Sequence, residues 1–363
     1  MESQAGWPAA DDDRTLRFTG NWREYFPTAA TNALLIIATL GIYRFWAKAR
    51  ERRYLWSRTF VIDDTLEWTG TGGEMFVGFL LVLAIILPFF LVFQFVLPAL
   101  MVRGETALAF ATFALFYVGL MYFGGVARFR ALRYRLSRSW WHGIRGGSDD
   151  RGWGYGVEFL GRYALVVITF FIPFPWATTK LWNRRWGAMT FGPSNFECDL
   201  TSEGLKRRWA ALYLVPPLLL LAMGAMIALL AGSPDATAAS AKVGIISTFA
   251  IVILAFYLAM PLMTLHWFAK FYRHAAAATA LGDLRFEFDA RTRDWLKLFI
   301  GNLALVVFTL GFGLAFWGYR NWSFVVRHTH LYGTVNPEAL TQSRTLSPRE
   351  AEGFADAFDV GAF

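Results

Sequence analysis

The sequence predicts an all-α polytopic membrane protein with four spanning helices and three re-entrant or interfacial helical segments. Small cytoplasmic strand-like hairpins and internal repeats complete the prediction. Three observations support it: an apolar composition, four long uncharged runs, and a one-sided distribution of basic residues. Of the 363 residues, 56% are hydrophobic and only 17% are charged, whereas a soluble domain has about 25% charged residues. This balance indicates a chain that places much of its surface in lipid.

Four uncharged apolar runs reach the length of about 20 residues that a helix needs to cross the hydrocarbon layer. They are Met75–Val102, Thr106–Ala127, Trp209–Pro234 and Val243–Ala269. Each run has a charged residue directly before it, and none contains a Lys, Arg, Asp or Glu. We therefore predict that each of the four runs spans the membrane.

Three further apolar segments are shorter and contain helix breakers. They are Tyr25–Tyr43, Tyr163–Thr179 and Leu298–Tyr319, with glycine or proline near the C-terminal part of each. The distribution of Lys and Arg indicates whether these segments span the membrane, because short cytoplasmic loops carry most of the basic residues. With four spans, 32 basic residues lie on one side and only Arg103 and Lys242 on the other. With seven spans this asymmetry disappears, so we predict that the three segments enter the membrane and return.

The same asymmetry places both termini and the basic hairpins in the cytoplasm of a bacterial inner-membrane protein. The first 17 residues include three successive aspartates and no apolar core, which is not the pattern of a signal peptide. We expect residues 1–16 to be a flexible N-terminus and residues 341–363 to be a flexible cytoplasmic tail.

The three shorter segments resemble one another, which predicts an internal repeat. Asn32 precedes Thr39 by seven residues, Asn302 precedes Thr309 by the same interval, and the middle copy has Arg162 before Thr169. The predicted units are residues 17–150, residues 151–290 and a half unit at residues 291–340. Short strand-like pieces follow the basic-aromatic stretches at Leu66–Trp68 and Phe196–Cys198, and a further one, Phe286–Phe288, follows the last spanning run. Repeated units of this kind often build a transporter whose site lies between them, but duplication also builds other membrane folds.

The stretch Thr39–Arg50, TLGIYRFWAKAR, with Phe18-Thr19-Gly20 before it, resembles the YjgN-like family of bacterial inner-membrane domains of unknown function. The resemblance covers about residues 17–340, although the second copy departs from the motif with Phe-Phe-Ile-Pro. It implies an inner-membrane location and the same fold. It implies no activity, substrate, cofactor or catalytic residue.

Polar residues within the apolar segments are the candidates for a ligand site, because ionisable groups at membrane depth are costly and often functional. Glu158 lies four residues before Arg162, so the two are predicted to pair on one helix face. The same pair has a purely structural interpretation as the lock of a re-entrant helix. The ligand-binding candidates are Asn32, Thr39, Glu158, Arg162, Thr169, Asn302 and Thr309.

Basic residues interleaved with aromatic ones follow each short segment. This pattern also occurs in proteins that bind single-stranded nucleic acid, but at the end of an apolar segment it is typical of a membrane interface. We expect membrane lipids, in particular anionic ones, as partners, and no nucleic acid. The lipid-headgroup candidates are Arg44, Lys48, Arg50, Arg53, Lys180, Arg184 and Arg320.

Enzyme signals are weak. The two histidines of His328-Thr-His330 lack a third metal ligand that the sequence identifies, so no metal and no cofactor are predicted. Two hypotheses remain for function. The first is a permease or channel that moves a small solute through a site between the repeats, and the second is an anionic-lipid-binding or membrane-organising protein that acts through its basic-aromatic hairpins.

Overall fold

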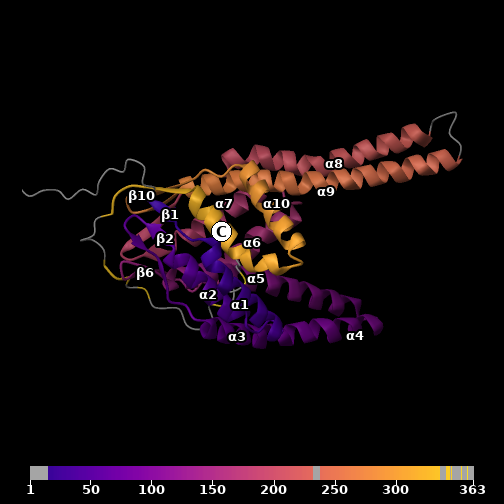
Figure 1. Cartoon of the computed structure of the whole chain (residues 1–363). Coiled ribbons are helices and arrows are strands. Elements are labelled where there is room, and N and C mark those ends of the chain that lie inside the picture. Colours follow the sequence, from indigo (N-terminus) through magenta and orange to yellow (C-terminus); the bar gives the residue numbers. More distant parts are fainter. Residues whose placement is uncertain are drawn as a thin grey trace, which may run out of the picture.

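The computed structural model describes residues 15–231, 238–335 and 341–343, together with residues 345, 353 and 358. The predicted flexible ends, residues 1–16 and 341–363, lie largely outside the described residues. Figure 1 shows strands gathered at one end of the molecule and long helices extending from it, among them α8 (Glu203–Ala231) and α9 (Ala238–Ala277). The chain therefore has a mixed helix-and-strand body with long apolar helices projecting away from it.

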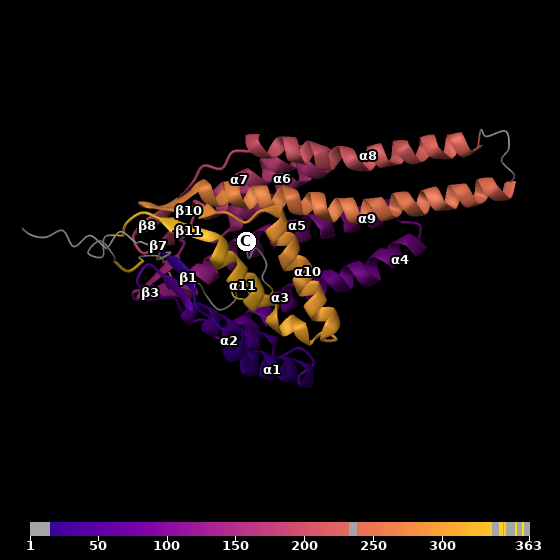
Figure 2. The same cartoon turned by 45° about the horizontal axis from the view of Figure 1, so that its top comes forward.

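Four helices are long and apolar enough to cross a membrane, the number predicted from the sequence. The first combines α3 (Gly72–Leu91), the π-helical η1 (Val92–Val96) and α4 (Leu97–Val102), and the second is α5 (Thr106–Arg138). The other two are α8 and α9. At most 6% of the most apolar window of each helix is buried, so these surfaces face the surroundings. Figures 1 and 2 show α8 running beside α9 as one pair, with α4 near α5 as another.

The three shorter segments form helical hairpins. The first hairpin consists of α1 (Trp22–Ala38) and α2 (Arg44–Ser57), and the second of α6 (Trp153–Ile168) and α7 (Phe174–Trp186). The third consists of α10 (Thr292–Phe308), the 3₁₀ turn η2 (Phe312–Phe316) and α11 (Trp317–His328). The first turn of α1 is capped by Asn21, whose side chain accepts a hydrogen bond from the Arg23 backbone N–H at 2.9 Å.

The turns between the paired helices share an uncommon backbone. Leu40, Phe170 and Leu310 occupy the same place in the three turns and have φ of 51°, 51° and 50°, values that non-glycine residues rarely adopt. Their side chains are 94%, 74% and 92% exposed. Each hairpin therefore presents a large, exposed apolar side chain at its tip.

The strands correct the predicted fold class. Instead of small separate hairpins in an all-α protein, eight strands form one antiparallel sheet in the order β11-β10-β9-β8-β7-β6-β5-β4. The strands are β4 (Glu67–Trp68), β5 (Ser139–Trp141), β6 (Ile144–Gly147), β7 (Thr190–Phe191), β8 (Ser194–Cys198), β9 (Thr279–Leu281), β10 (Leu284–Phe288) and β11 (Thr329–Tyr332). The sequence did not predict this single sheet, because strands of two to five residues are too short to show a period, and some of the partner strands are separated by whole spanning helices. The strand-like pieces themselves were recognised correctly, since they form or overlap β4, β8 and β10.

Turn chemistry fixes the pairing of the short strands. Trp141 pairs with Ile144 across a two-residue loop of His142 and Gly143, whose φ values are 48° and 70°. Two successive positive φ values match the right-handed twist of a tight β-hairpin. A second sheet of β1 (Leu16–Phe18), β2 (Thr59–Val61) and β3 (Asp64–Thr65) closes the start of the first unit. The hairpins predicted to be cytoplasmic, near Arg58, Ser139, Thr190, Leu284 and Thr329, all lie in or beside these sheets.

Aromatic side chains fill the cores between hairpins and sheet. One core is built around Tyr25, Trp56 and Tyr134, a second around Phe129 and Phe159, and others follow in the second unit. The predicted unit boundaries at residues 150 and 290 fall in the short connections before α6 and α10. Within the predicted tail, Phe358 packs on Phe45 with ring centroids 6.0 Å apart.

Candidate functional site

A cavity of about 520 Å³ lies where the three helical hairpins meet the ends of α5 and α9. We call it the central cavity. Its lining contains five cationic residues: Lys48, Arg52, Arg128, Arg135 and Arg185. Twelve aromatic residues line it as well: Trp56, Tyr155, Phe159, Tyr163, Phe174, Trp182, Trp267, Phe268, Phe271, Tyr272, Trp317 and Trp322. No described Asp or Glu is among the lining residues, so the cavity combines positive charge with aromatic surface.

The second helix of each hairpin contributes the same register positions to the central cavity. Counted from Thr39, Thr169 and Thr309, the ninth residue is Lys48, Thr178 or Gly318, and all three line the cavity. The thirteenth is Arg52, Trp182 or Trp322, and all three line it again. Positions four residues apart lie on one helix face. The three hairpins therefore turn the same face towards one space.

Two spanning helices supply the rest of the charge and much of the aromatic wall. Arg128 and Arg135 are seven residues apart near the C-terminal end of α5 and so share one face. Trp267 and Phe271 come from the equivalent end of α9. The cavity thus lies at the basic ends of the apolar helices, which is the level of a membrane interface if those helices span.

Aromatic rings hold several of these cations. The Arg52 guanidinium carbon lies 4.8 Å from the centroid of the Trp68 ring, and that of Arg128 lies 4.9 Å from the Phe159 ring. Arg52 and Arg185 are 3% and 6% exposed. Charges so buried attract an anion strongly, because the local dielectric screens them poorly.

Basic residues are also crowded next to the cavity-lining end of α5. Burial lowers the pKa of Arg145 on β6, and the neighbouring charges of Arg138 and Arg133 lower it further. Mutual repulsion of this kind indicates a positive electrostatic potential around this end of the molecule.

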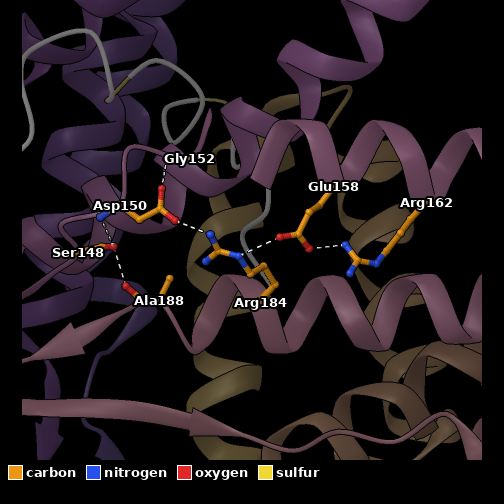
Figure 3. A network of polar contacts seen from close by, with 7 residues as sticks. All are labelled: Ser148, Asp150, Gly152, Glu158, Arg162, Arg184 and Ala188. Carbon is orange, nitrogen blue, oxygen red and sulfur yellow. Dashed lines mark hydrogen bonds and ion pairs between the residues drawn. The ribbon is translucent and has the colours of Figure 1, made fainter. Parts of the chain in front are cut away.

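The second hairpin is closed by a chain of ion pairs, drawn in Figure 3. Arg162 donates to Glu158 over 2.5 Å, the pairing that their spacing predicts. Arg184 on α7 donates to the other Glu158 oxygen at 3.1 Å and to Asp150 at 2.7 Å. Asp150 in turn accepts from the Gly152 backbone N–H at 2.7 Å. The chain joins α6, α7 and the connection before α6, so these contacts have a direct structural role.

The sister positions of Arg162 are amides that bond within their own hairpins. Asn32 is 5% exposed, and its Nδ2 donates to the Ala47 carbonyl of α2 at 3.3 Å. Asn302 is 4% exposed, donates to Asn321 Oδ1 at 3.0 Å and accepts from Arg320 Nε at 2.6 Å. Neither amide nor Arg162 lines the central cavity. The structure therefore places the three residues at the joints of separate hairpins and does not bring them together.

The three threonines cap the first helix of each hairpin. Each donates its hydroxyl to the carbonyl four residues earlier, at 2.7 Å for Thr39 and 2.6 Å for Thr169 and Thr309. Thr39 and Thr309 also accept from the backbone N–H four residues later. Thr169 has no such donor, because Pro173 stands there and lacks an N–H. These contacts explain the recurring threonine by the geometry of the turn.

The lipid-headgroup candidates divide into three groups. Lys48 alone lines the central cavity, where its Nζ also pairs with Glu51 at 3.0 Å. Four others are exposed on the surface: Arg44, Arg50, Arg53 and Lys180. Arg184 and Arg320 make the contacts within hairpins described above. Four of the five cavity cations were not among the candidates, namely Arg52, Arg128, Arg135 and Arg185.

A usable signal for the missed residues exists in the sequence. Lys48 and Arg52 are one helical turn apart, and Arg128 and Arg135 are two turns apart just after the second long apolar run. Cations repeated on one face beside buried aromatic residues indicate an inward-facing charge. The headgroup prediction selected cations by their closeness to the apolar segment and did not use the helix face.

His328 and His330 converge on one carboxylate. His328 Nδ1 lies 2.6 Å from Asp289 Oδ1, and His330 Nε2 lies 3.2 Å from Asp289 Oδ2. Burial alone would raise the pKa of Asp289, but the two histidines outweigh it and the pKa is lowered. In the described part of the chain, no group of three or more His, Cys, Asp or Glu side chains has the arrangement of a metal site.

Comparison with known proteins identifies relatives of unknown activity. A family model described as "Bacterial protein of unknown function (DUF898)" matches residues 13–357. The inner membrane protein YjgN of Salmonella typhimurium is 30% identical over 165 residues, which are 44% of this chain and 39% of that protein. Its namesake from Escherichia coli K12 is 30% identical over 156 residues, 43% of this chain and 34% of that protein. Each match thus spans well under half of the relative, and no solved structure matches the chain.

Proposed function

This chain belongs to the DUF898 family of bacterial proteins of unknown function, and we propose that it binds the anionic headgroup of a membrane amphiphile in the central cavity. The resemblance to YjgN inferred from the sequence is confirmed, and the relatives' name supports an inner-membrane location. The activity of the family is unknown, so the proposal rests on the geometry of this chain.

The central cavity is the observation that carries the proposal. Five cationic side chains and twelve aromatic ones line it, and no described carboxylate does. Cations recognise phosphate and carboxylate groups by charge-assisted hydrogen bonds, and aromatic rings provide the apolar wall typical of small-ligand sites. A volume of about 520 Å³ is in the range of such sites.

The surroundings of the cavity favour a ligand that belongs to the membrane. The cavity lies at the basic ends of α5 and α9, where anionic headgroups would gather if these helices span. The exposed apolar tips at Leu40, Phe170 and Leu310 support insertion of all three helical hairpins into the same leaflet. A headgroup site at that depth is reached by lateral diffusion from the bilayer.

The permease or channel predicted first is a second candidate. In its favour, three helical hairpins converge on one cavity. Against it, the apolar windows of the four long helices are almost entirely exposed, so the four helices of one chain do not enclose a path across the bilayer. Transport would require further chains to complete a path, whereas headgroup binding requires none.

We also propose a membrane topology for the chain and a common origin for its three helical hairpins. Basic-residue asymmetry supports sheets, hairpin bases and both termini on the cytoplasmic side. The common turn backbone and the common register in the central cavity support descent of the three helical hairpins from one unit. Neither the topology nor the common origin depends on which ligand the central cavity binds.

Lipid titration followed by native mass spectrometry tests the headgroup proposal. The purified protein in neutral detergent is titrated with dioleoylphosphatidylglycerol or with dioleoylphosphatidylcholine. We expect clear preference for the anionic lipid, and at least tenfold weaker binding of it after the double change Arg128→Gln and Arg135→Gln. The matched control is Arg50→Gln with Lys180→Gln, which removes the same charge from exposed positions. Equal losses in both double variants, or no preference between the lipids, would refute a headgroup site in the cavity.

Cysteine labelling tests the topology. In a Cys198→Ser background, Asn195→Cys reports on an exposed position of β8, and Glu105→Cys reports on the turn between α4 and α5. We expect a membrane-impermeant maleimide added to intact spheroplasts to label Glu105→Cys only. Labelling of Asn195→Cys from outside would contradict the four-span topology.

A further inference from the structure

An apolar groove of about 640 Å³ adjoins the central cavity. It lies between the tip of the second hairpin and the helices α8 and α9. Its walls include Phe170 and Phe171 from the tip, Leu212 and Pro216 from α8, and Met260 from α9. We call it the apolar groove.

The central cavity and the apolar groove share part of their walls. Phe174, Trp267 and Phe268 line both spaces. The Phe174 ring stacks on Trp209 in the groove at 4.5 Å and meets Trp267 at 5.3 Å between centroids. A cationic space thus lies next to an apolar one across a narrow aromatic border, which is the arrangement that an amphiphile with one charged end requires.

The second hairpin differs from the first at the position that borders the groove. Phe174 stands five residues after Thr169, where the first hairpin has Arg44 five residues after Thr39. The Arg44 guanidinium carbon lies 4.1 Å from the centroid of the Phe358 ring, whereas Phe174 faces the groove and its tryptophans. The first hairpin therefore places a cation where the second has an apolar border.

We infer that the cavity and the groove form one phospholipid site, with the anionic headgroup in the central cavity and an acyl chain in the apolar groove. The inference rests on the proposed function and adds the chemical class of the ligand: a diacyl anionic phospholipid and not a free phosphate compound. Charge complementarity selects the headgroup, and the apolar walls select the chain. Residues of α8 and α9 form much of the groove wall. If these two helices span the membrane, the acyl chains of the bilayer run beside them.

Binding of two probes separates the inference from the proposed function. The first is dioleoylphosphatidylglycerol, and the second is glycerophosphoglycerol, which is the same headgroup without acyl chains. We expect the lipid to bind at least a hundredfold more tightly than the chainless headgroup. If the two bind equally, the headgroup site stands and the acyl groove is refuted; if neither binds, the proposed function itself fails.

A groove-filling variant provides the structural arm of the test. Thr264→Trp introduces a large side chain into the groove from α9, and Leu258→Trp introduces the same side chain at an exposed position of the same helix outside the groove lining. We expect Thr264→Trp to weaken lipid binding at least tenfold while glycerophosphoglycerol binding and the circular-dichroism melting curve are unchanged. Leu258→Trp should change none of the three. Equal effects of both variants on lipid binding would overturn the acyl-groove assignment.

Photo-crosslinking covers the case in which Thr264→Trp does not fold. Phosphatidylglycerol carrying a diazirine on one acyl chain is bound to the unchanged protein, irradiated and mapped by peptide mass spectrometry. We expect labels concentrated on the peptides that contain Leu212 and Met260. Labels distributed evenly along all four long helices would mean ordinary surrounding lipid and would refute the site.

Discussion

The second and third helical hairpins have the same turn but are locked by different chemistry. In the second, Arg162, Glu158, Arg184 and Asp150 form a chain of ion pairs from α6 to α7. In the third, the amide of Asn302 is held between α10 and α11 by Arg320 and Asn321. The shape of a hairpin is therefore set by its turn and aromatic core, whereas the polar lock varies between copies.

In the first hairpin, the residue equivalent to Arg162 and Asn302 makes the weakest polar contact of the three. Asn32 makes one long hydrogen bond, and its Oδ1 is buried without a partner among the described residues. We therefore expect aromatic packing around Tyr25 and Trp56 to contribute most of the stability of this hairpin.

The largest effect is expected from the aromatic core. Trp56 is 3% exposed, stacks on Trp322 at 4.2 Å between centroids and donates to Ser139 Oγ at 2.8 Å. Trp56→Ala should lower the free energy of unfolding by about 3–5 kcal/mol. Trp186, the equivalent residue of the second hairpin, is less buried, so Trp186→Ala should cost less. Denaturant unfolding in detergent measures both, and a larger loss for Trp186→Ala would contradict packing as the main lock of the first hairpin.

Replacement of the two buried asparagines, Asn302 and Asn32, should lower the free energy of unfolding by different amounts. Asn302→Leu removes two side-chain hydrogen bonds and leaves the partly buried partners Arg320 and Asn321 with one fewer contact each, at a cost of about 1–3 kcal/mol. Asn32→Leu removes one bond of 3.3 Å and an unpartnered oxygen, so its cost should be within about 1 kcal/mol of zero. The same unfolding measurement compares them. Equal losses would show that the Asn32 amide has a role that its contacts do not reveal.

Changes at the three capping threonines should differ less in their effect on stability. Thr39→Val and Thr309→Val each remove donated bonds and one bond accepted from a backbone N–H. Thr169→Val removes donated bonds only, because Pro173 has no N–H. The first two changes should cost about 1 kcal/mol more than the third. Identical costs at all three positions would mean that the accepted bond contributes nothing to stability.

The smallest effect concerns the pH dependence of the third hairpin. The pKa of Asp289 is lowered by His328 and His330, so its stabilising contribution is present above the unfolded pKa near 3.8 and is lost as the pH falls through the lower folded value. Its side chain is 49% exposed, which limits the contribution to about 1 kcal/mol or less. The difference in stability between the natural chain and Asp289→Asn should therefore shrink as the pH falls below about 4. A difference that grows below pH 4 would have the wrong sign.

Features with a local or periodic signal were predictable from the sequence. The four long helices follow from uninterrupted apolar runs, and the turns of the three hairpins follow from Gly41, Pro173 and Gly311. The pair of Glu158 and Arg162 follows from its spacing of four residues. Each of these depends on residues close in the chain, which is why a single sequence suffices.

Features that depend on distant residues were not predictable in the same way. Phe196 pairs with Leu281 across both α8 and α9, and nothing in a three-residue strand identifies such a partner. The central cavity likewise takes Arg52 from the first unit and Arg185 from the second. The candidates Asn32, Arg162 and Asn302 were chosen for polarity within apolar segments, which is also the property of a residue that joins two helices.

The order of the eight-stranded sheet has a mechanical consequence. Its strands follow the order of the chain, so the pair of α3–α4 with α5 and the pair of α8 with α9 enter the body at different points along one continuous ladder. The apolar windows of both pairs are almost entirely exposed, whereas the ends of α5 and α9 both line the central cavity. A thinner or thicker bilayer changes the tilt of spanning helices, and here such a tilt would reach the cavity wall directly.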